Sequence, residues 1–234
     1  MEIFLQSRLF LNLVLIFPAN AQCKDKIMKK SILTLIIISL FSIQSFAQQR
    51  ADALVLYRNG KYAEAIKICE QEIVEDPQNI DSYCVLCWSL VRNRQYAEAE
   101  QRSAEARKIN STDVRLIEIQ AEAKFYLGKN TAALELFQYY LANVPANGSR
   151  IGNAYYYMGE IYIRQAKYQH ADISFSTAVH TEPLVDYWWT RCGYAREMTG
   201  NYNSALEAYS KAIELNGSNS DAIRGRERVV AKLR

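Results

Sequence analysis

The residues best suited to chemistry in this sequence are its cysteines. Cys84 and Cys87 form a CxxC motif, a spacing used by redox pairs and by metal ligands. No second CxxC accompanies the motif and no strand pattern precedes it, and we expect it to lie within a helix. We therefore favour a packing role for both cysteines. A disulfide from Cys69 to Cys84 or Cys87 and thiol redox chemistry stay open as alternatives.

The histidines and the known catalytic motifs give no sign of an active site. His170 and His180 are ten residues apart, and neither has a cysteine or a pair of carboxylates at ligand spacing. The sequence contains no glycine-rich phosphate loop, nucleophile elbow or HExxH motif. We therefore predict that the protein is not an enzyme, binds no metal and needs no cofactor.

The charge balance argues against one class of partner. The formal net charge is +3, but five of the 28 basic and two of the 25 acidic residues precede residue 48, which leaves 23 of each. Proteins that bind nucleic acid need a basic patch that displaces phosphate counterions. No nucleic-acid partner is therefore predicted.

Residues 28–47 have the pattern of a secretory signal peptide. Met28-Lys29-Lys30 precedes an apolar run over residues 32–43, and Ser45-Phe46-Ala47 carries the small residues that signal peptidase reads. The run is shorter than the ~20 apolar residues of a membrane span. We predict cleavage after Ala47, no stable membrane insertion afterwards, and a periplasmic or secreted bacterial protein.

Residues 1–27 precede this signal peptide and have no evident role beside it. They contain a second apolar run, residues 9–17, followed by Ala19-Asn20-Ala21. Two export signals in tandem would be redundant. We interpret Met28 as the true start of the protein and residues 1–27 as a non-native upstream extension. A membrane-inserted leader is the alternative.

The rest of the chain repeats itself with one period. A Tyr-x-x-Ala signal, in which Asn130 once replaces the tyrosine, recurs at steps of 34, 34, 38 and 34 residues. A series of small residues and a series of helix breakers keep the same steps, and three series in one register indicate a repeat architecture. The series are Tyr62, Tyr96, Asn130, Tyr168 and Tyr202; Ala53, Cys87, Ala121, Gly159 and Gly193; and Pro77, Ser111, Pro145, Pro183 and Gly217.

The 34-residue period and the residues that keep it resemble the tetratricopeptide repeat (TPR). The resemblance covers about residues 49–219 and implies units of two helices that stack into a solenoid, because one helix pair cannot bury its apolar face alone. The fourth unit is the best match, with Tyr155, Met158, Gly159, Tyr162, Tyr168, Ala171, Phe175, Ala178 and Pro183.

We therefore predict an all-α fold, a right-handed α-solenoid of about five TPR helix pairs that ends in a C-terminal capping helix. Pairs should turn at Gly60, Gly128 and Gly200, and the small residue of each pair should lie where its helices cross closely. Residues 148–151, the four extra residues of the 38-residue step, lengthen one loop. The predicted units are about 49–79, 80–113, 114–147, 152–185 and 186–219, and the cap is 220–234.

The TPR resemblance also implies where a partner binds. In the family, the first helix of each unit lines a concave groove that holds a peptide or a partner helix. Those positions carry rings and arginines here, which are enriched at binding hot spots. The predicted partner-binding residues are Tyr57, Arg58, Trp88, Arg92, Arg115, Glu122, Phe125, Tyr126, Tyr156, Glu160, Arg164, Tyr187 and Tyr194, beside the further groove positions Leu54, Glu118, Asn153, Thr190 and Glu197.

The predicted function is a non-enzymatic protein–protein interaction scaffold in the bacterial cell envelope, which binds a peptide or a partner subunit in the groove. One alternative is a glycan-binding module that stacks sugars on Trp88, Tyr156 and Tyr187. A second alternative is a thiol redox protein that uses Cys84 and Cys87. The partner and the oligomeric state do not follow from the sequence.

Overall fold

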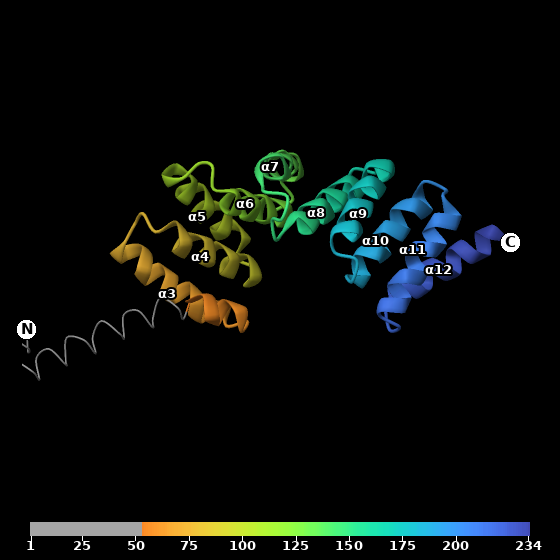
Figure 1. Ribbon diagram of the computed structural model, residues 1–234, viewed down its shortest axis with the longest axis horizontal. Helices are drawn as coiled ribbons and strands as arrows, with labels where there is room; N and C mark the ends of the chain where they lie inside the picture. The colour runs from red at the N-terminus through yellow and green to blue at the C-terminus, as the bar shows by residue number, and fades with distance from the viewer. Residues whose placement is uncertain (1–52) are drawn as a thin grey trace, which may run out of the picture. The chain divides into compact units, whose positions relative to one another are not determined.

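The computed structural model describes residues 53–234, and this part of the chain contains helices and connecting turns with no strand (Figure 1). The predicted extension 1–27, the predicted signal peptide 28–47 and its cleavage site after Ala47 lie outside the described residues. No helix among the described residues is long and apolar enough to cross a membrane. The prediction of an all-α solenoid is confirmed.

Helices follow one another at the predicted period. A helical segment at residues 53–58 comes first. The helices after it are α3 (Tyr62–Glu75), α4 (Ile80–Arg92), α5 (Tyr96–Ile109), α6 (Val114–Tyr126), α7 (Asn130–Asn143), α8 (Ile151–Arg164), α9 (Tyr168–Thr181), α10 (Asp186–Met198), α11 (Tyr202–Leu215) and α12 (Ser220–Leu233).

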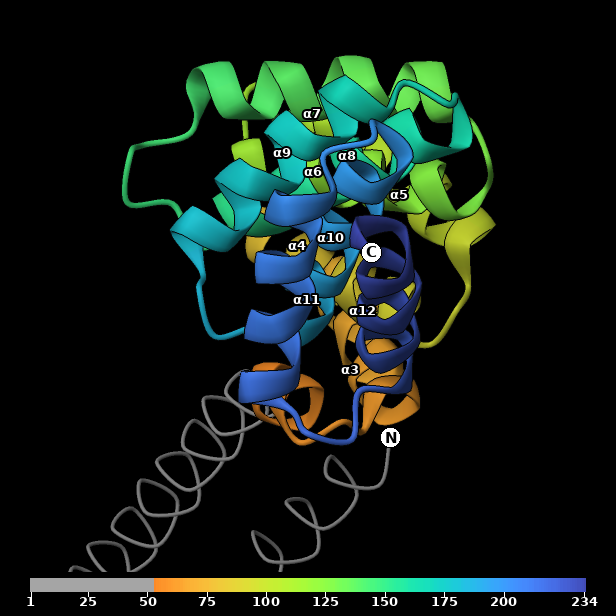
Figure 2. The ribbon, with the colours of Figure 1, turned by 90° about the vertical axis from the view of Figure 1, so that its right-hand side faces the viewer.

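Consecutive helices pack against each other along the whole array, and the first helices of neighbouring units also touch. α4 contacts α6, α6 contacts α8, and α10 contacts the last helix, α12. Seen along the array in Figure 2, α4, α6, α8 and α10 lie toward the middle, and α5, α7 and α11 lie farther out. We call the surface of residues 53–58, α4, α6, α8 and α10 the inner face.

The turn inside each unit repeats one backbone conformation. Gly60, Gly128 and Gly200 have φ values of 77°, 74° and 79°, the left-handed region that glycine adopts at little cost. The second and fourth units reach the same conformation without glycine, at Arg94 with φ 64° and at Ala166 with φ 55°. The period therefore fixes the turn even where its preferred residue is missing.

The small residues lie where helices cross, as the sequence predicts. A β-carbon on Gly159 of α8 would lie 2.6 Å from the Phe175 ring of α9, and one on Gly193 of α10 would lie 2.8 Å from the Tyr209 ring of α11. Such distances are too short for any side chain. The glycines therefore let each first helix approach a ring of its own second helix.

Candidate interaction surface

The predicted partner-binding residues differ widely in exposure. Tyr126 on α6 and Tyr187 on α10 keep 42% and 47% of their surface exposed, so two large rings of the inner face are open to solvent. Among the remaining predicted residues, Arg58, Arg92 and Arg164 are exposed, Tyr57, Trp88, Arg115, Tyr156, Glu160 and Tyr194 are half-buried, and Glu122 and Phe125 are buried.

Two further tyrosines, Tyr157 and Tyr156, connect the exposed rings of Tyr126 and Tyr187 into one continuous strip. The ring centroids of Tyr126 and Tyr157 are 5.9 Å apart, those of Tyr157 and Tyr156 are 5.5 Å apart, and those of Tyr156 and Tyr187 are 5.3 Å apart. We call these four residues the aromatic band. It runs from α6 over α8 to α10 and therefore spans three units. Sequence reasoning missed Tyr157, which is buried and joins the two ends.

The exposed ends of the aromatic band are held by further rings. Tyr126 stacks on Tyr96 of α5, with centroids 4.5 Å apart and planes 13° apart. At the other end Tyr187 packs edge-on against the buried Trp188, with centroids 6.0 Å apart, and its neighbour Tyr156 stacks on the same ring at 5.7 Å. Because their neighbours fix them, the rings lose little conformational entropy when a partner binds.

Four predicted groove positions are buried and do not face a partner, namely Phe125, Glu122, Glu118 and Thr190. Phe125 is 5% exposed because the Arg164 guanidinium lies 3.9 Å from its ring centroid, and the same guanidinium donates a 3.1 Å hydrogen bond to the Phe125 carbonyl. Glu122 is 2% exposed because it pairs with Arg150 from the loop before α8. The expectation that these four side chains line an open groove is therefore wrong, and Phe125 and Glu122 support the surface from beneath.

Glu122 belongs to a buried polar cluster under the aromatic band. The Tyr157 hydroxyl donates a 2.5 Å hydrogen bond to Glu122, and the Arg150 guanidinium also donates to this carboxylate. Arg150 Nη2 lies 2.8 Å from Oε1 of Glu118, which is 1% exposed. Burial is the main cause that raises the pKa of Glu118 to about 7, against the opposing charge of Arg150.

Other charged positions of the inner face join neighbouring units. Arg115 of α6 lies 2.8 Å from Asp81 of α4, and Arg191 of α10 donates bonds of 2.5 and 3.0 Å to Glu160 of α8. These arginines and carboxylates neutralise each other between units. These two charge pairs therefore hold neighbouring units together, and the exposed rings and the exposed Arg58 and Arg92 remain for a partner.

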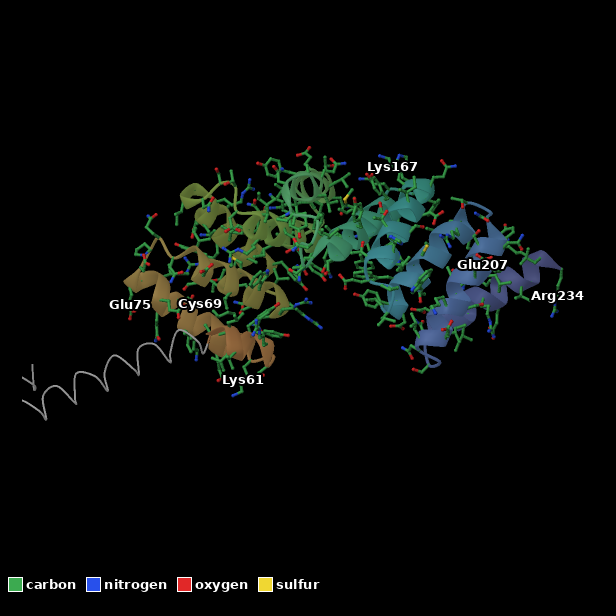
Figure 3. All side chains as sticks on the ribbon, viewed as in Figure 1. Lys61, Cys69, Glu75, Lys167, Glu207 and Arg234 are labelled. Carbon is green, nitrogen blue, oxygen red and sulfur yellow. The ribbon has the colours of Figure 1, made fainter. Side chains whose placement is uncertain are left out.

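The cysteines behave as core residues. Cys69, Cys84, Cys87 and Cys192 are buried free thiols, and Cys69 lies among the helices in Figure 3, where charged side chains such as Lys61 and Glu75 point outward. Burial raises the pKa of Cys69 and of Cys84 to about 12, which disfavours the reactive thiolate. In the described part, no group of three or more His, Cys, Asp or Glu side chains could hold a metal.

Comparisons with known proteins place the fold. Residues 189–219 match the family model of the tetratricopeptide repeat. No curated protein sequence matches the chain significantly.

Solved structures of similar fold include TPR proteins and MamA proteins. MamA 41-end from Desulfovibrio magneticus RS-1 has 17% identity and a TM-score of 0.61, over 74% of this chain and 95% of that one. TTC0263, a thermophilic TPR protein of Thermus thermophilus, has 18% identity and a TM-score of 0.59, over 80% and 97%. YrrB, described as a TPR protein with an unusual peptide-binding site, has 16% identity and a TM-score of 0.58, over 75% and 88%. Residues 189–219 are therefore a tetratricopeptide repeat, and the described chain as a whole has the fold of a tetratricopeptide-repeat array.

Proposed function

We propose that the protein is a non-enzymatic interaction scaffold that binds a segment of a partner protein on its inner face, at the aromatic band. The observation that carries the proposal is the open exposure of Tyr126 and Tyr187 on two first helices, joined through Tyr156 and Tyr157. Rigid, amphipathic rings of this kind dominate the binding energy of many interfaces. A peptide-binding site on a similar array, that of YrrB, supports the same use here.

The hydrogen bonds beneath the aromatic band define what a partner must offer at one end. Tyr157 has a single hydroxyl proton, which it donates to Glu122, so in its 3.2 Å contact with Tyr126 it accepts. Tyr126 therefore uses its proton inward and presents only acceptor lone pairs to solvent. A backbone N–H or a side-chain donor of the partner fits this position, whereas a carbonyl oxygen does not.

We further propose that the scaffold works in the bacterial envelope, as a periplasmic or secreted protein. The support is the charged start, apolar run and small-residue end of residues 28–47. Protein purified from the exporting cell should begin at Gln48 when its N-terminus is sequenced. An N-terminus at Met1 or Met28 in the envelope fraction would contradict the proposal.

Quantitative capture of envelope proteins tests the aromatic band. Tyr126→Ala and Tyr187→Ala should each weaken capture of the same partner by at least about tenfold, the effect of losing roughly 1.4 kcal/mol or more at a hot spot. Tyr139→Ala is the matched control, because Tyr139 is 45% exposed on the second helix α7, outside the aromatic band. The identified partner is then titrated as a purified protein by calorimetry.

Two results would count against this function. If Tyr139→Ala weakens binding as much as the variants of the aromatic band, the assignment of the surface is wrong. If a soluble-glycan affinity gel retains the protein and loses it with Tyr126→Ala and Tyr187→Ala, the inner face binds sugar and not protein.

A further inference from the structure

Two carboxylates buried in α6 share one cation. Glu118 and Glu122 lie one helical turn apart, and they are 1% and 2% exposed. The Arg150 guanidinium, whose side chain is 18% exposed, pairs with both. A buried charge without a full partner is costly, so two negative charges against one positive charge give this cluster one carboxylate in excess.

The hydrogen bonds show which carboxylate is in excess. Glu122 accepts from both Arg150 and Tyr157. The only polar contact of the Glu118 carboxylate among the described residues is the 2.8 Å approach of Arg150 Nη2 to Oε1, and its second oxygen has no hydrogen-bond partner. Glu118 is therefore the member of the pair that gains most from taking up a proton.

The remaining charged and titratable groups around Glu118 come from two other helices. The positive charge of Arg92 on α4 lowers the pKa of Glu118 from a greater distance than Arg150 does. The pKa of Tyr140 on α7 is raised by burial and by the negative charge of Glu118. Neither group is bonded to Glu118 in the described structure. Protonation of Glu118 is therefore what balances the cluster locally.

Arg150 reaches the cluster from the four extra residues. The N-cap of α6 is Asp113, and a regular 34-residue step would place the N-cap of α8 at Asn147. Instead α8 starts at Ile151, and its N-cap is Arg150, whose side chain makes no capping hydrogen bond. α7 and α8 also contact each other less than the helices at the corresponding junctions elsewhere in the array. The cluster thus adds polar contacts to the apolar core that joins the third and fourth units, in which Phe137 of α7 stacks on Tyr157 of α8.

We propose that Glu118, Glu122 and Arg150 form a proton-dependent lock on this junction. With Glu118 protonated, Arg150 and Glu122 balance each other and α8 is held against α6. With Glu118 ionised, the cluster carries uncompensated negative charge and the junction loosens. The lock is a property of the array itself and does not depend on any partner.

The direction of the pH dependence follows from linkage. The pKa of Glu118 rises from its ordinary value of 4.5 in the unfolded chain to about 7 in the folded protein. The folded state then holds more protons, so stability from this group is present at low pH and is lost as the pH rises toward and through 7. These values give an unfolding constant about tenfold larger at pH 8.5 than at pH 6 from Glu118 alone.

Urea unfolding of the purified protein at pH 6 and pH 8.5 tests the lock. Glu118→Gln keeps the shape and removes the charge, so it should remove that tenfold change and unfold at higher urea than the wild type at pH 8.5. Glu135→Gln is the matched control, because Glu135 is exposed on α7. Its profile should run parallel to that of the wild type. Histidine side chains also titrate between pH 6 and 8.5, but both variants keep His170 and His180. A difference between the pH profiles of the two variants therefore reports the loss of the Glu118 carboxylate.

Two further measurements need no variant. A carboxyl carbon resonance of the wild-type protein should titrate near pH 7 in NMR spectra. Hydrogen exchange in residues 144–152, corrected for its intrinsic pH dependence, should accelerate more between pH 6 and 8.5 than in the loop at residues 182–185. The lock is refuted if Glu118→Gln and wild type show parallel profiles, if Glu118→Gln is the less stable at pH 8.5, or if every carboxyl titrates near its ordinary pKa.

Discussion

Two regions of the array solve the same joining problem with different chemistry. In the last units, the Tyr209 ring of α11 fills the space opened by two glycines, Gly193 of α10 and Gly225 of α12. Between the third and fourth units, α6 and α8 meet over Glu118, Glu122 and Arg150. The first junction is close apolar packing, and the second combines an apolar core with a buried ion cluster.

The difference teaches what each kind of junction can do. Apolar packing depends on volume alone and has the same strength at any pH. A buried ion cluster depends on the number of protons and on each charge having its partner. The junction that holds the cluster is also the one beneath the aromatic band, since Tyr157 belongs to both. The part of the array that we propose binds a partner is therefore joined in part by a contact that responds to pH.

Removing the cation should give the largest effect. Arg150→Ala leaves two buried carboxylates without their guanidinium, and we expect a loss of about 3 to 5 kcal/mol in the free energy of unfolding near neutral pH. Low millimolar guanidinium, far below denaturing concentrations, should restore part of this stability by occupying the vacated position. Thermal unfolding with and without the ion measures both effects.

Arg226→Ala serves as the control for this prediction, because Arg226 is exposed on α12. We expect its unfolding free energy to stay within about 0.5 kcal/mol of wild type. Equal losses for the two arginine variants would mean that the cluster does not hold the junction. If sodium chloride restores the stability of Arg150→Ala and guanidinium does not restore more, general screening of the two carboxylates explains the rescue, and not occupation of the vacated position.

Filling the apolar junction should have the next largest effect. Gly225→Ala places a β-carbon against the Tyr209 ring, and Gly193→Ala places one 2.8 Å from the same ring. Each should cost about 1 to 3 kcal/mol in unfolding free energy, because the ring is enclosed and held by the 2.7 Å bond from its hydroxyl to Glu197, and so cannot move away from the added carbon. The cost should be the same at pH 6 and pH 8.5, because the substitution changes no charge.

Gly217→Ala is the matched substitution in open surroundings, where the nearest atom to a new β-carbon is 4.0 Å away. Its unfolding free energy should equal or exceed that of wild type. If Gly217→Ala is as damaging as Gly225→Ala, helix propensity or turn effects and not the approach of the ring explain the losses.

The sequence predicts the parts of this molecule that repeat. The series Ala53 to Gly193 locates the close helix crossings because a small residue is required there in every unit. The apolar packing of Cys87 follows from the same series, and the structure confirms that this thiol is buried. The exposed positions Tyr126 and Tyr187 follow from the register together with the family resemblance.

What the sequence does not predict lies outside the period. Residues 148–151 read as a longer loop, and nothing in their types shows that Arg150 turns inward onto α6. The burial of Glu122 then follows from Arg150 and not from its own position. One signal was present: Tyr157 follows Glu122 by 35 residues, about one helical turn short of the 38-residue step between these units, which places the two side chains on neighbouring first helices.

The turns offer the smallest effect and the most direct test of the shared register. Ala166 adopts φ 55° where three other units place glycine, and this conformation strains an alanine by about 1 to 2 kcal/mol. Replacing Ala166 with glycine relieves the strain, but glycine also has more conformational freedom in the unfolded chain, which offsets part of the stabilisation. Ala166→Gly should therefore stabilise the protein by about 0.5 to 1 kcal/mol. The same substitution inside a helix, Ala104→Gly in α5, should destabilise it by about 1 kcal/mol. The chemical change is identical, but Ala104 is half-buried and also loses methyl contacts, so the decisive result is the sign at the exposed Ala166. A loss of stability in Ala166→Gly, measured by chemical unfolding, would refute the left-handed turn there.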